Sequence, residues 1–341
     1  MLRDMLTRLI GGDDFTTDEA EAAMNHIMSG EASEAEIGGF LVAMRIRGEK
    51  PEHVEGFARC MRGACVPIRA RSQDLVDTCG TGGDMMQTFN ISTAAALVAA
   101  GAGVKIAKHG NRSVSSHCGS ADVLAELGVD INQSPEQVAD AIDTYGLGFL
   151  FAPNLHPAMK YAIGPRRALG IRTVFNILGP LTNPAGASRQ LLGVFAPELT
   201  ETLAHTLERL GSVHALVVHG LDGIDELSTI GVTRVSELHE GTVNTYDLEP
   251  ESFGFARATP EDIAGGTPQD NARIIEQTLD GEPGPRRDIV LYNAGAAIYV
   301  GGKAPDIASG IMMAAESLDS GTARGVLEHL RGGCRGSTEA G

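Results

Sequence analysis

Several features that would mark other classes of protein are missing from the sequence. It has no tryptophan, aromatic residues make up 4% of it, and no apolar run is long enough to span a membrane. The first ten residues include Arg3, Asp4 and Arg8 and so lack the apolar segment of a signal peptide, which leads us to expect a cytoplasmic protein. Basic residues are scarce too, since 27 Lys and Arg stand against 44 Asp and Glu and the net charge is -17. This balance argues against nucleic acid as a partner, because nucleic acid binding needs a basic surface.

Paired cysteines are missing as well. The five cysteines are odd in number and none has C-x-x-C spacing, so neither a disulfide framework nor a structural zinc site is expected. His117, His156 and His219 do not form metal-ligand spacing such as H-x-x-x-H, and we interpret them as structural.

What is present indicates a globular α/β protein. The 341 residues suffice for a large core and suggest two domains, and 43% hydrophobic residues with 43 glycines indicate a soluble, turn-rich chain. Over residues 1–72 short amphipathic helices alternate with glycine stops, which predicts a small all-helical domain. From Leu75 onward strands and helices alternate, which predicts a large α/β domain with a mostly parallel central sheet over residues 73–332. Residues 333–341 are expected to be a disordered tail.

The helical part carries clear signals for helix starts. Capping boxes are predicted at residues 16–19 and 33–36, glycine stops at Gly30 and Gly48, and Pro51 opens another helix. The helix expected over residues 37–46 has an apolar face made of Ile37, Phe40, Leu41 and Met44. This face belongs either to the core of the domain or to a dimer interface, and the residues alone leave both open.

The α/β part can be divided into elements by its apolar pattern. The strands expected from short apolar runs are residues 75–76, 104–107, 147–151, 191–195 and 215–218. The helices expected from residue spacing are 94–101, 121–127, 138–145, 199–210, 271–279 and 307–318. A turn at Glu240-Gly241 leads into residues 242–248, which are expected to form an antiparallel edge strand. Residues 157–170 are predicted to be helical, with a kink or break at Pro165.

The stretch from Asp77 to Gly128 organises the rest of the chain. Its loop at residues 80–84, GTGGD, contains three glycines that let backbone N–H groups approach phosphate oxygens. A helix then begins near Ser92 or Thr93 and offers a second anion site at its N-terminus. The next strand leads into the basic segment 108–113, at the strand end where open α/β sheets bind ligands. A Gly-rich turn alone is more often only a turn, but the whole series predicts a site for two phosphate groups.

Six motifs occur in order along nearly the whole chain. They are GTGGD at 80–84, NIST at 90–93, KHGNR at 108–112, GSADVLAELG at 119–128, HPAMKYAIGPRRALGIRTVFNILGPLTNP at 156–184 and DGIDELS at 222–228. Together they resemble the anthranilate phosphoribosyltransferases. The resemblance implies a helical domain beside a nucleoside phosphorylase-like α/β domain, a segment around 165–186 that returns to the helical domain, and a homodimer formed through that domain.

The resemblance also implies an enzyme of tryptophan synthesis, which transfers the 5-phosphoribosyl group of phosphoribosyl pyrophosphate to the amine of anthranilate. Its cofactor would be Mg²⁺, because the pyrophosphate group needs a cation that prefers hard oxygen ligands. Two Mg²⁺ ions are expected when substrate is bound. An arylamine is neutral at pH 7 and needs no base before it attacks. We therefore expect positioning and charge stabilisation by Lys108 and the metal site, not a general base. For His109 we favour a donor or packing role over proton transfer.

Site residues follow position by position from the matching motifs. Those implied for the phosphoribosyl donor are Gly80, Gly83, Asp84, Thr88, Asn90, Ile91, Ser92, Thr93, Lys108, Gly110, Asn111, Arg112, Ser113, Ser115, Ser116 and Ser120. Those implied for anthranilate are Gly80, His109, Asn111 and Arg166, and those implied for the metal are Ser92, Asp225 and Glu226. Arg167 is a further candidate cation, and Met85 and Met86 have no assignable role.

Two alternatives remain open from the sequence. A pyrimidine nucleoside phosphorylase has a similar fold, but it would use phosphate and a nucleobase and would not need the pair Asp225 and Glu226. A non-catalytic relative that binds nucleic acid would show a basic surface and damaged motifs, which the charge of -17 and the intact motifs oppose.

Overall fold

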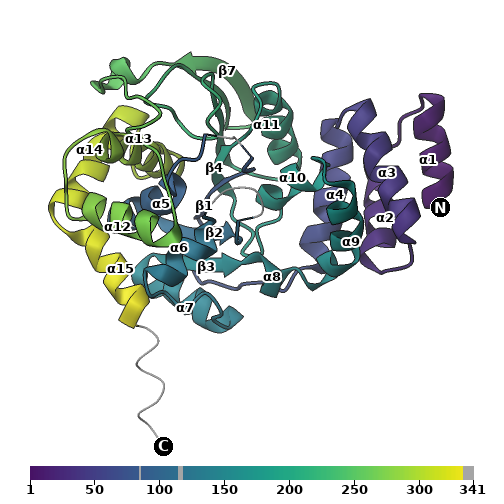
Figure 1. Ribbon diagram of the computed structural model, residues 1–341, viewed down its shortest axis with the longest axis horizontal. Helices are drawn as coiled ribbons and strands as arrows, with labels where there is room; N and C mark the ends of the chain where they lie inside the picture. Colours follow the sequence, from purple (N-terminus) through teal and green to yellow (C-terminus); the bar gives the residue numbers. More distant parts are fainter. Residues whose placement is uncertain (84–85, 114–117, 333–341) are drawn as a thin grey trace, which may run out of the picture.

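A computed structural model describes residues 1–83, 86–113 and 118–332. Several positions named above lie outside these ranges, namely Asp84, Met85, Ser115, Ser116, His117 and the tail 333–341. The described residues form a seven-stranded mixed sheet with helices on both faces and a bundle of helices at one end (Figure 1). The predicted fold class, a helical domain beside a mostly parallel α/β domain, is confirmed. Of the helices in these ranges, none is both long and apolar enough to cross a membrane.

The N-terminal part of the chain forms a bundle of helices. They are α1 (Leu2–Gly11), α2 (Thr17–Met28), α3 (Glu34–Arg47) and α4 (Pro51–Ala64). Both predicted capping boxes are confirmed, with Thr16 and Glu19 at the start of α2 and Ser33 and Glu36 at the start of α3. Each box satisfies backbone N–H groups that the first helical turn leaves without partners.

The apolar face of α3 belongs to the core. Its predicted members, Ile37, Phe40, Leu41 and Met44, are at most 1% exposed. They pack with Met24 of α2 and Phe57 of α4, in a cluster that continues into the α/β domain through Leu203 and Val217. The face is therefore used within the chain, and a dimer interface through the bundle would need other residues.

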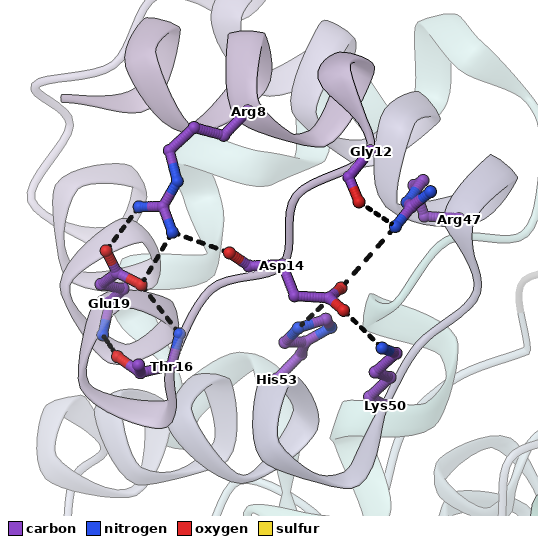
Figure 2. A network of polar contacts seen from close by, with 8 residues as sticks. All are labelled: Arg8, Gly12, Asp14, Thr16, Glu19, Arg47, Lys50 and His53. Atoms are coloured by element: carbon purple, nitrogen blue, oxygen red, sulfur yellow. Dashed lines mark hydrogen bonds and ion pairs between the residues drawn. The ribbon is translucent and has the colours of Figure 1, made fainter.

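Polar side chains hold the loop that joins α1 to α2, as Figure 2 shows. Arg8 donates to the carboxylate of Glu19 and, at 2.7 Å, to the backbone carbonyl of Asp14. The Asp14 carboxylate accepts from Lys50 at 2.5 Å and lies 3.9 Å from Arg47. Because solvent screens exposed ion pairs, each contributes little stability. Their common effect is to fix the path of the loop across α3 and α4.

The central sheet is mixed and mostly parallel. Its strands are β1 (Leu75–Gly80), β2 (Lys105–Gly110), β3 (Leu147–Phe151), β4 (Arg189–Gly193), β5 (His214–Gly220), β6 (Thr233–His239) and β7 (Thr242–Leu248). Their spatial order is β3-β2-β1-β4-β5-β6-β7, with parallel pairing from β3 to β5 and antiparallel pairing of β6 with both β5 and β7. From β1 to β3 each new strand is added on one side of β1, and from β4 onward each new strand is added on the other side. The boundary between β1 and β4 is therefore the topological switch point, where open α/β sheets bind ligands.

Helices cover both faces of this sheet (Figure 1). The α-helices after β1 are α5 (Ile91–Gly101), α6 (Ser120–Glu126), α7 (Pro135–Tyr145), α8 (Ala152–Leu155), α9 (Lys160–Leu169), α10 (Phe175–Leu178), α11 (Leu199–Arg209), α12 (Pro268–Leu279), α13 (Pro285–Val300), α14 (Ile307–Asp319) and α15 (Thr322–Gly332), and the 3₁₀ turns are η1 (Pro157–Met159), η2 (Gly179–Leu181) and η3 (Pro250–Phe253). Along β5, Ala215 and Val217 belong to the cluster shared with the bundle, whereas Leu216 and Val218 belong to the cluster of α5, α13 and α14. This alternation follows from the two-residue period of a strand and buries β5 on both faces.

The predicted elements around the organising stretch are found with shifted ends. β2 extends to Gly110, so Lys108 and His109 lie within the strand and not beyond it. α5 has Asn90 as its N-cap, which places Ser92 in the first turn and not at the cap. Both shifts arise because pairing of β2 with β3 and packing of α5 continue past the apolar runs that marked these elements.

Other departures have physical reasons too. Residues 157–170 were predicted to kink or break at Pro165; α9 continues through this proline without a break, and the irregular part of the segment lies earlier, in η1. Packing of α9 against α2 and α3 holds the helix although proline lacks an N–H group. β6 and α13 were not predicted at all. α13 is buried around most of its circumference, so its sequence lacks the polar face that marks an amphipathic helix.

Candidate active site

The predicted site residues gather at the carboxyl ends of the parallel strands. Gly80 ends β1, Gly110 ends β2, Gly193 ends β4, and the loop that carries Asp225 and Glu226 follows β5. Parallel strands bring their carboxyl ends to one edge of the sheet, and this is the edge that binds ligands in open α/β folds.

Close contact with Asp225 shapes the glycine loop after β1. Gly82 and Gly83 have φ angles of 66° and 78°, in the left-handed region that favours glycine. The N–H of Gly82 donates to Oδ2 of Asp225 at 2.8 Å. A Cβ on Gly80 would overlap this carboxylate, and a Cβ on Gly193 would overlap the Asp225 carbonyl. Glycine at these positions therefore allows the loop after β5 to approach β1 and β4.

The loop after β5 is anchored on two sides. Asn293 of α13 accepts a hydrogen bond from the N–H of Leu227 at 3.0 Å and donates one to its carbonyl at 2.9 Å. On the other side, Oε1 of Glu226 accepts the N–H of Ser92 at 3.2 Å, in the first turn of α5. These bonds hold Asp225 and Glu226 against the glycine loop and the start of α5.

The three residues predicted to bind metal are thereby brought together. Ser92 is joined directly to Glu226, and Asp225 precedes Glu226 in the same anchored loop. Their carboxylate and hydroxyl oxygens are hard donors of the type that Mg²⁺ prefers. The donor set therefore fits the predicted ion.

Lys108 is a buried cation between β1 and α5. Its side chain is 1% exposed, and Nζ donates to the carbonyl of Thr78 at 2.5 Å and to Oγ of Ser92 at 3.3 Å. Within the described ranges no carboxylate forms an ion pair with it. Burial lowers the pKa of Lys108, while the nearby carboxylates of Asp77 and Glu226 act to raise it. A cation held beside the first turn of α5 is well placed to meet an anionic ligand.

Asp77 is a buried carboxylate to which the sequence analysis assigned no role. It accepts from the N–H of His109 at 3.1 Å and from Nδ2 of Asn183 at 2.8 Å. Asn183 also donates to the carbonyl of Ala107 at 2.8 Å and so joins β1 to β2. Burial raises the pKa of Asp77 to about 6, although Asn183 and Lys108 act against this rise. The signal in the sequence is an aspartate inside an apolar strand, since such residues are rarely buried without partners.

His109 and His156 form a buried pair. Their Nε2 atoms are 3.2 Å apart, and their ring centroids are separated by 5.1 Å. Burial lowers the pKa of His109 to about 3, with a further contribution from His156, and lowers the pKa of His156 to about 4. Both rings are therefore neutral at pH 7, and so low a pKa makes His109 a weak base. His156, interpreted above as structural, touches a residue of the predicted anthranilate site.

Arg166 lies on α9 with its guanidinium over the ring of Phe175, 5.1 Å from the ring centroid. Among the described residues its guanidinium makes no hydrogen bond or ion pair, and neither joins it to Asn111 or His109. Burial lowers the pKa of Arg166, but a guanidinium remains charged at neutral pH. A half-buried cation of this kind is suited to the carboxylate of a ligand. Its neighbour Arg167 is exposed.

The predicted donor residues after β2 are held against the start of α6. Arg112 forms an ion pair with Asp122 at 2.7 Å, and the N–H of Ser113 donates to the same carboxylate at 3.0 Å. Ser120 is the first residue of α6, and its hydroxyl donates to the carbonyl of Asn111 at 3.4 Å. The charge of Arg112 is therefore already paired within the chain.

The predicted donor residues around the start of α5 differ in their surroundings. The side chain of Asn90 accepts a hydrogen bond from Asn271 at 2.9 Å. Thr93 is buried, and its hydroxyl has no hydrogen-bond partner in the described part of the chain. Ile91 is buried, and Thr88 forms an isolated β-bridge with the segment before α12.

Arg172 is a further residue that the sequence analysis missed. It follows α9, donates from Nη2 to the carbonyl of Gly83 at 2.7 Å, and lies 4.4 Å from the ring centroid of Phe195. It thereby links the glycine loop to the chain after β4. The sequence does carry a signal for this residue, because Arg172 lies in the motif at 156–184. Only Arg166 and Arg167 of that motif were considered as candidate cations.

Comparisons with known proteins agree with this architecture. A family profile described as the a/b domain of a glycosyl transferase family matches residues 72–324, and one for its helical bundle domain matches residues 3–65. The anthranilate phosphoribosyltransferase of Desulfosudis oleivorans is 53% identical over 331 residues, which cover 97% of this chain and 98% of the relative. The chain belongs to the anthranilate phosphoribosyltransferase family.

Solved structures of anthranilate phosphoribosyltransferases share the fold. The enzyme of Thermus thermophilus is 46% identical and has a TM-score of 0.92, with 97% of this chain and 99% of that chain covered. The enzyme of Saccharomyces cerevisiae in complex with PRPP and Mg is 30% identical and has a TM-score of 0.89, with 98% of each chain covered. The family resemblance drawn from the six motifs is thus confirmed. The roles of individual residues stay predictions.

Proposed function

We propose that this protein transfers the 5-phosphoribosyl group from phosphoribosyl pyrophosphate to the amine nitrogen of anthranilate. The C1–O bond to pyrophosphate breaks, a C1–N bond forms and the amine loses a proton, which gives N-(5-phosphoribosyl)anthranilate and pyrophosphate. This is the second step of tryptophan synthesis from chorismate. The observation that carries the proposal is the meeting of the glycine loop, the first turn of α5 and the loop of Asp225 and Glu226 at the switch point of the sheet.

The donor site uses backbone groups and one buried cation. The glycine loop and the first turn of α5 offer N–H groups to phosphate oxygens, as helix starts and glycine-rich loops do elsewhere. Lys108 supplies positive charge within hydrogen-bonding distance of Ser92. Because it is buried and fixed by Thr78, its charge is preorganised for a leaving group that becomes more negative as the bond breaks.

The metal site would be formed by Ser92, Asp225 and Glu226, which hold two Mg²⁺ ions when the donor is bound. Bound Mg²⁺ supplies positive charge that stabilises the departing pyrophosphate. The N–H groups of Gly82 and Ser92 orient the two carboxylates before any ligand arrives. This preorganisation lowers the cost of assembling the site.

The acceptor site would combine Arg166 with Gly80, His109 and Asn111. Arg166 binds the anthranilate carboxylate, since a planar guanidinium matches a planar carboxylate and no described carboxylate occupies it. The neutral pair of His109 and His156 offers no strong base. The proposed reaction requires none, because the attacking arylamine already carries a free electron pair.

We further propose a homodimer formed through the helical bundle. Ile10 at the end of α1 and Ile46 at the end of α3 are 76% and 78% exposed, and these two helices pack against each other. Exposed apolar side chains on adjacent helices favour a partner surface. Sedimentation velocity at micromolar concentration should give twice the chain mass, and Ile46→Glu should shift the protein to a monomer. The cytoplasmic location stays a prediction.

The activity can be tested by the loss of anthranilate fluorescence. The complete mixture contains anthranilate, phosphoribosyl pyrophosphate and Mg²⁺, and each component is omitted in turn. The proposal expects fluorescence to fall only in the complete mixture, with release of pyrophosphate in equal amount. Folded protein that leaves anthranilate unchanged but cleaves a pyrimidine nucleoside in phosphate would overturn the proposal.

A further inference from the structure

Two histidines and a glutamate meet at the edge of the sheet opposite the candidate active site. His214 begins β5 and lies directly across from His239, the last residue of β6, in the antiparallel register. Glu237 lies two residues before His239 and therefore on the same face of β6. The possible ligand atoms of the three side chains all lie within 4.8 Å of one another.

The spacing of these groups resembles that of ligands around one ion. The rings of His214 and His239 are stacked, with centroids 4.2 Å apart and 20° between their planes. Nε2 of His214 lies 3.0 Å from Oε1 of Glu237. Two ligands of a tetrahedral zinc ion, each about 2.0 Å from the metal, are about 3.3 Å apart. Small side-chain shifts would therefore place all three around one metal.

The carboxylate of Glu237 is held by a second layer of donors. Tyr299 of α13 donates to Oε1 at 2.7 Å, and Tyr246 of β7 donates to Oε2 at 2.8 Å. Nε2 of His214 also lies 3.0 Å from Oε1, so three groups fix the orientation of this carboxylate, as is common for carboxylate ligands of metals.

The cluster is open to solvent on one side. The His214 side chain is 3% exposed and that of Glu237 14%, whereas His239 at the end of β6 belongs to the exposed residues. An ion can thus enter past His239, and water can complete its coordination. The buried half of the site is fixed by the fold before an ion arrives.

This cluster is separate from the predicted Mg²⁺ site. β5 runs from His214 to Gly220, and at 3.3 Å per residue its ends are about 20 Å apart. Asp225 and Glu226 follow the far end of that strand. The donor types differ too, because imidazole nitrogens select zinc and similar transition metals while Mg²⁺ prefers oxygen. Nothing in the proposed transfer reaction uses the three residues.

We propose that His214, Glu237 and His239 bind one divalent transition metal ion of the zinc class, with water as a fourth ligand. The ion would take the place of the proton that His214 shares with Glu237, so both imidazoles must be neutral for binding. It would join β5 to β6 directly, and through Tyr246 and Tyr299 it would reach β7 and α13. Its effect would be to stabilise the antiparallel end of the sheet.

The test is a Co²⁺ titration of the untagged 341-residue protein after treatment with a chelator. We expect one Co²⁺ per chain, with the visible absorption bands of a four-coordinate ion. Zn²⁺ should displace the Co²⁺, and millimolar Mg²⁺ should not. His239→Ala and Glu237→Gln should each weaken Co²⁺ binding at least tenfold. His205→Ala, at a partly exposed histidine that also contacts a glutamate, should leave it unchanged.

Thermal unfolding supplies the second measurement. Zn²⁺ should raise the Tm of the wild type and of His205→Ala but not that of His239→Ala. Because His239 is exposed, its replacement leaves the bonds of Tyr246 and Tyr299 to Glu237 in place, and circular dichroism checks the fold. Equal Co²⁺ affinity in the wild type and in His239→Ala would overturn the proposal. So would absorption bands of a six-coordinate ion that Mg²⁺ displaces.

Discussion

Asn183 donates a 2.8 Å hydrogen bond to the buried carboxylate of Asp77, although 106 residues separate the two in sequence. The bond ties the chain before β4 to β1, the strand that leads into the glycine loop. Through the N–H of His109, the same carboxylate also fixes the strand that carries Lys108. Asp77 is therefore a positioning residue, which acts on the predicted donor site through the backbone of β2 and the charge of Lys108.

The raised pKa of Asp77 should be visible in the pH dependence of stability. Its pKa rises from 3.8 to about 6 on folding, so the folded state binds the proton more tightly than the unfolded state. The stabilisation of the folded state by protonated Asp77 is therefore complete below pH 4 and is lost as the pH rises through 6. Two pKa units correspond to about 3 kcal/mol. Between pH 4 and pH 7 the free energy of unfolding of the wild type should therefore fall by about this amount relative to that of Asp77→Asn.

Urea unfolding at several pH values measures this difference. The control is Asp74→Asn, at an exposed carboxylate just before the same strand, whose difference from the wild type should stay constant. If the difference in free energy of unfolding between the wild type and Asp77→Asn also stayed constant across this range, burial would not raise the pKa of Asp77.

Gly193→Ala should disturb both stability and activity. The new Cβ would overlap the carbonyl of Asp225, so β4 or the loop after β5 must move. We expect a loss of about 1–3 kcal/mol in the free energy of unfolding and a lower turnover, because Asp225 moves with its loop. Gly63→Ala in α4 meets open space and should instead stabilise the protein by about 0.5–1 kcal/mol. An active Gly193→Ala variant with unchanged urea midpoint would contradict the close approach.

Local signals predicted local structure well. The capping boxes at Thr16 and Ser33 and the strand after Glu240-Gly241 depend on residues within a few positions of one another. Both turn residues have positive φ angles, 52° and 72°, as a tight hairpin requires, and β7 is the expected antiparallel edge strand. The order of the glycine loop, α5 and β2 was predictable for the same reason, since they lie in one continuous stretch.

Relationships that depend on tertiary packing were not predictable in this way. The bond between Asp77 and Asn183 requires that β1 and the chain before β4 lie side by side, and no local pattern specifies that. The pairing of His214 with His239 depends on the register of β5 with β6, a strand that was not recognised. A search for short metal-ligand spacings therefore overlooks this cluster, because antiparallel pairing and not sequence spacing brings its members together.

Lys108→Met should reduce turnover while the fold persists. The variant removes a buried charge that touches Ser92 and Thr78. Loss of one preorganised charge at a leaving group lowers kcat on the order of 100-fold. Lys105→Met, on the same strand but at its other end, removes a lysine that bonds to the carbonyl of Asp143 and should keep kcat within about twofold. Equal kcat for the two variants would show that the charge of Lys108 does not contribute to catalysis.

Asp225→Asn combined with Glu226→Gln should alter the response to Mg²⁺. Both changes keep side-chain size but remove the negative charge on which a hard cation depends. We expect a fall in kcat and a shift of the Mg²⁺ activation curve to at least tenfold higher concentration. Glu240→Gln, at an exposed turn residue between β6 and β7, serves as the control for a lost surface charge. An unshifted Mg²⁺ curve would place the ion elsewhere.

Arg166→Ala should act on anthranilate and not on the phosphoribosyl donor. Arg166 is half-buried, has no carboxylate partner among the described residues and lies over Phe175, so its charge is available to a ligand. A hydrogen bond to a charged group contributes about 1.5–3 kcal/mol, which corresponds to a rise of about 10- to 100-fold in the KM for anthranilate. The KM for phosphoribosyl pyrophosphate should change little.

Arg167→Ala is the matched control for that variant, since it removes the adjacent arginine, which is exposed. Steady-state kinetics with each substrate varied in turn separates the two KM values. Arg166→Lys should recover part of the affinity, because a lysine keeps the charge but loses the planar pair of donors. If the KM for anthranilate stayed unchanged in Arg166→Ala while kcat fell, Arg166 would act on the reacting groups and another cation would have to bind the acceptor carboxylate.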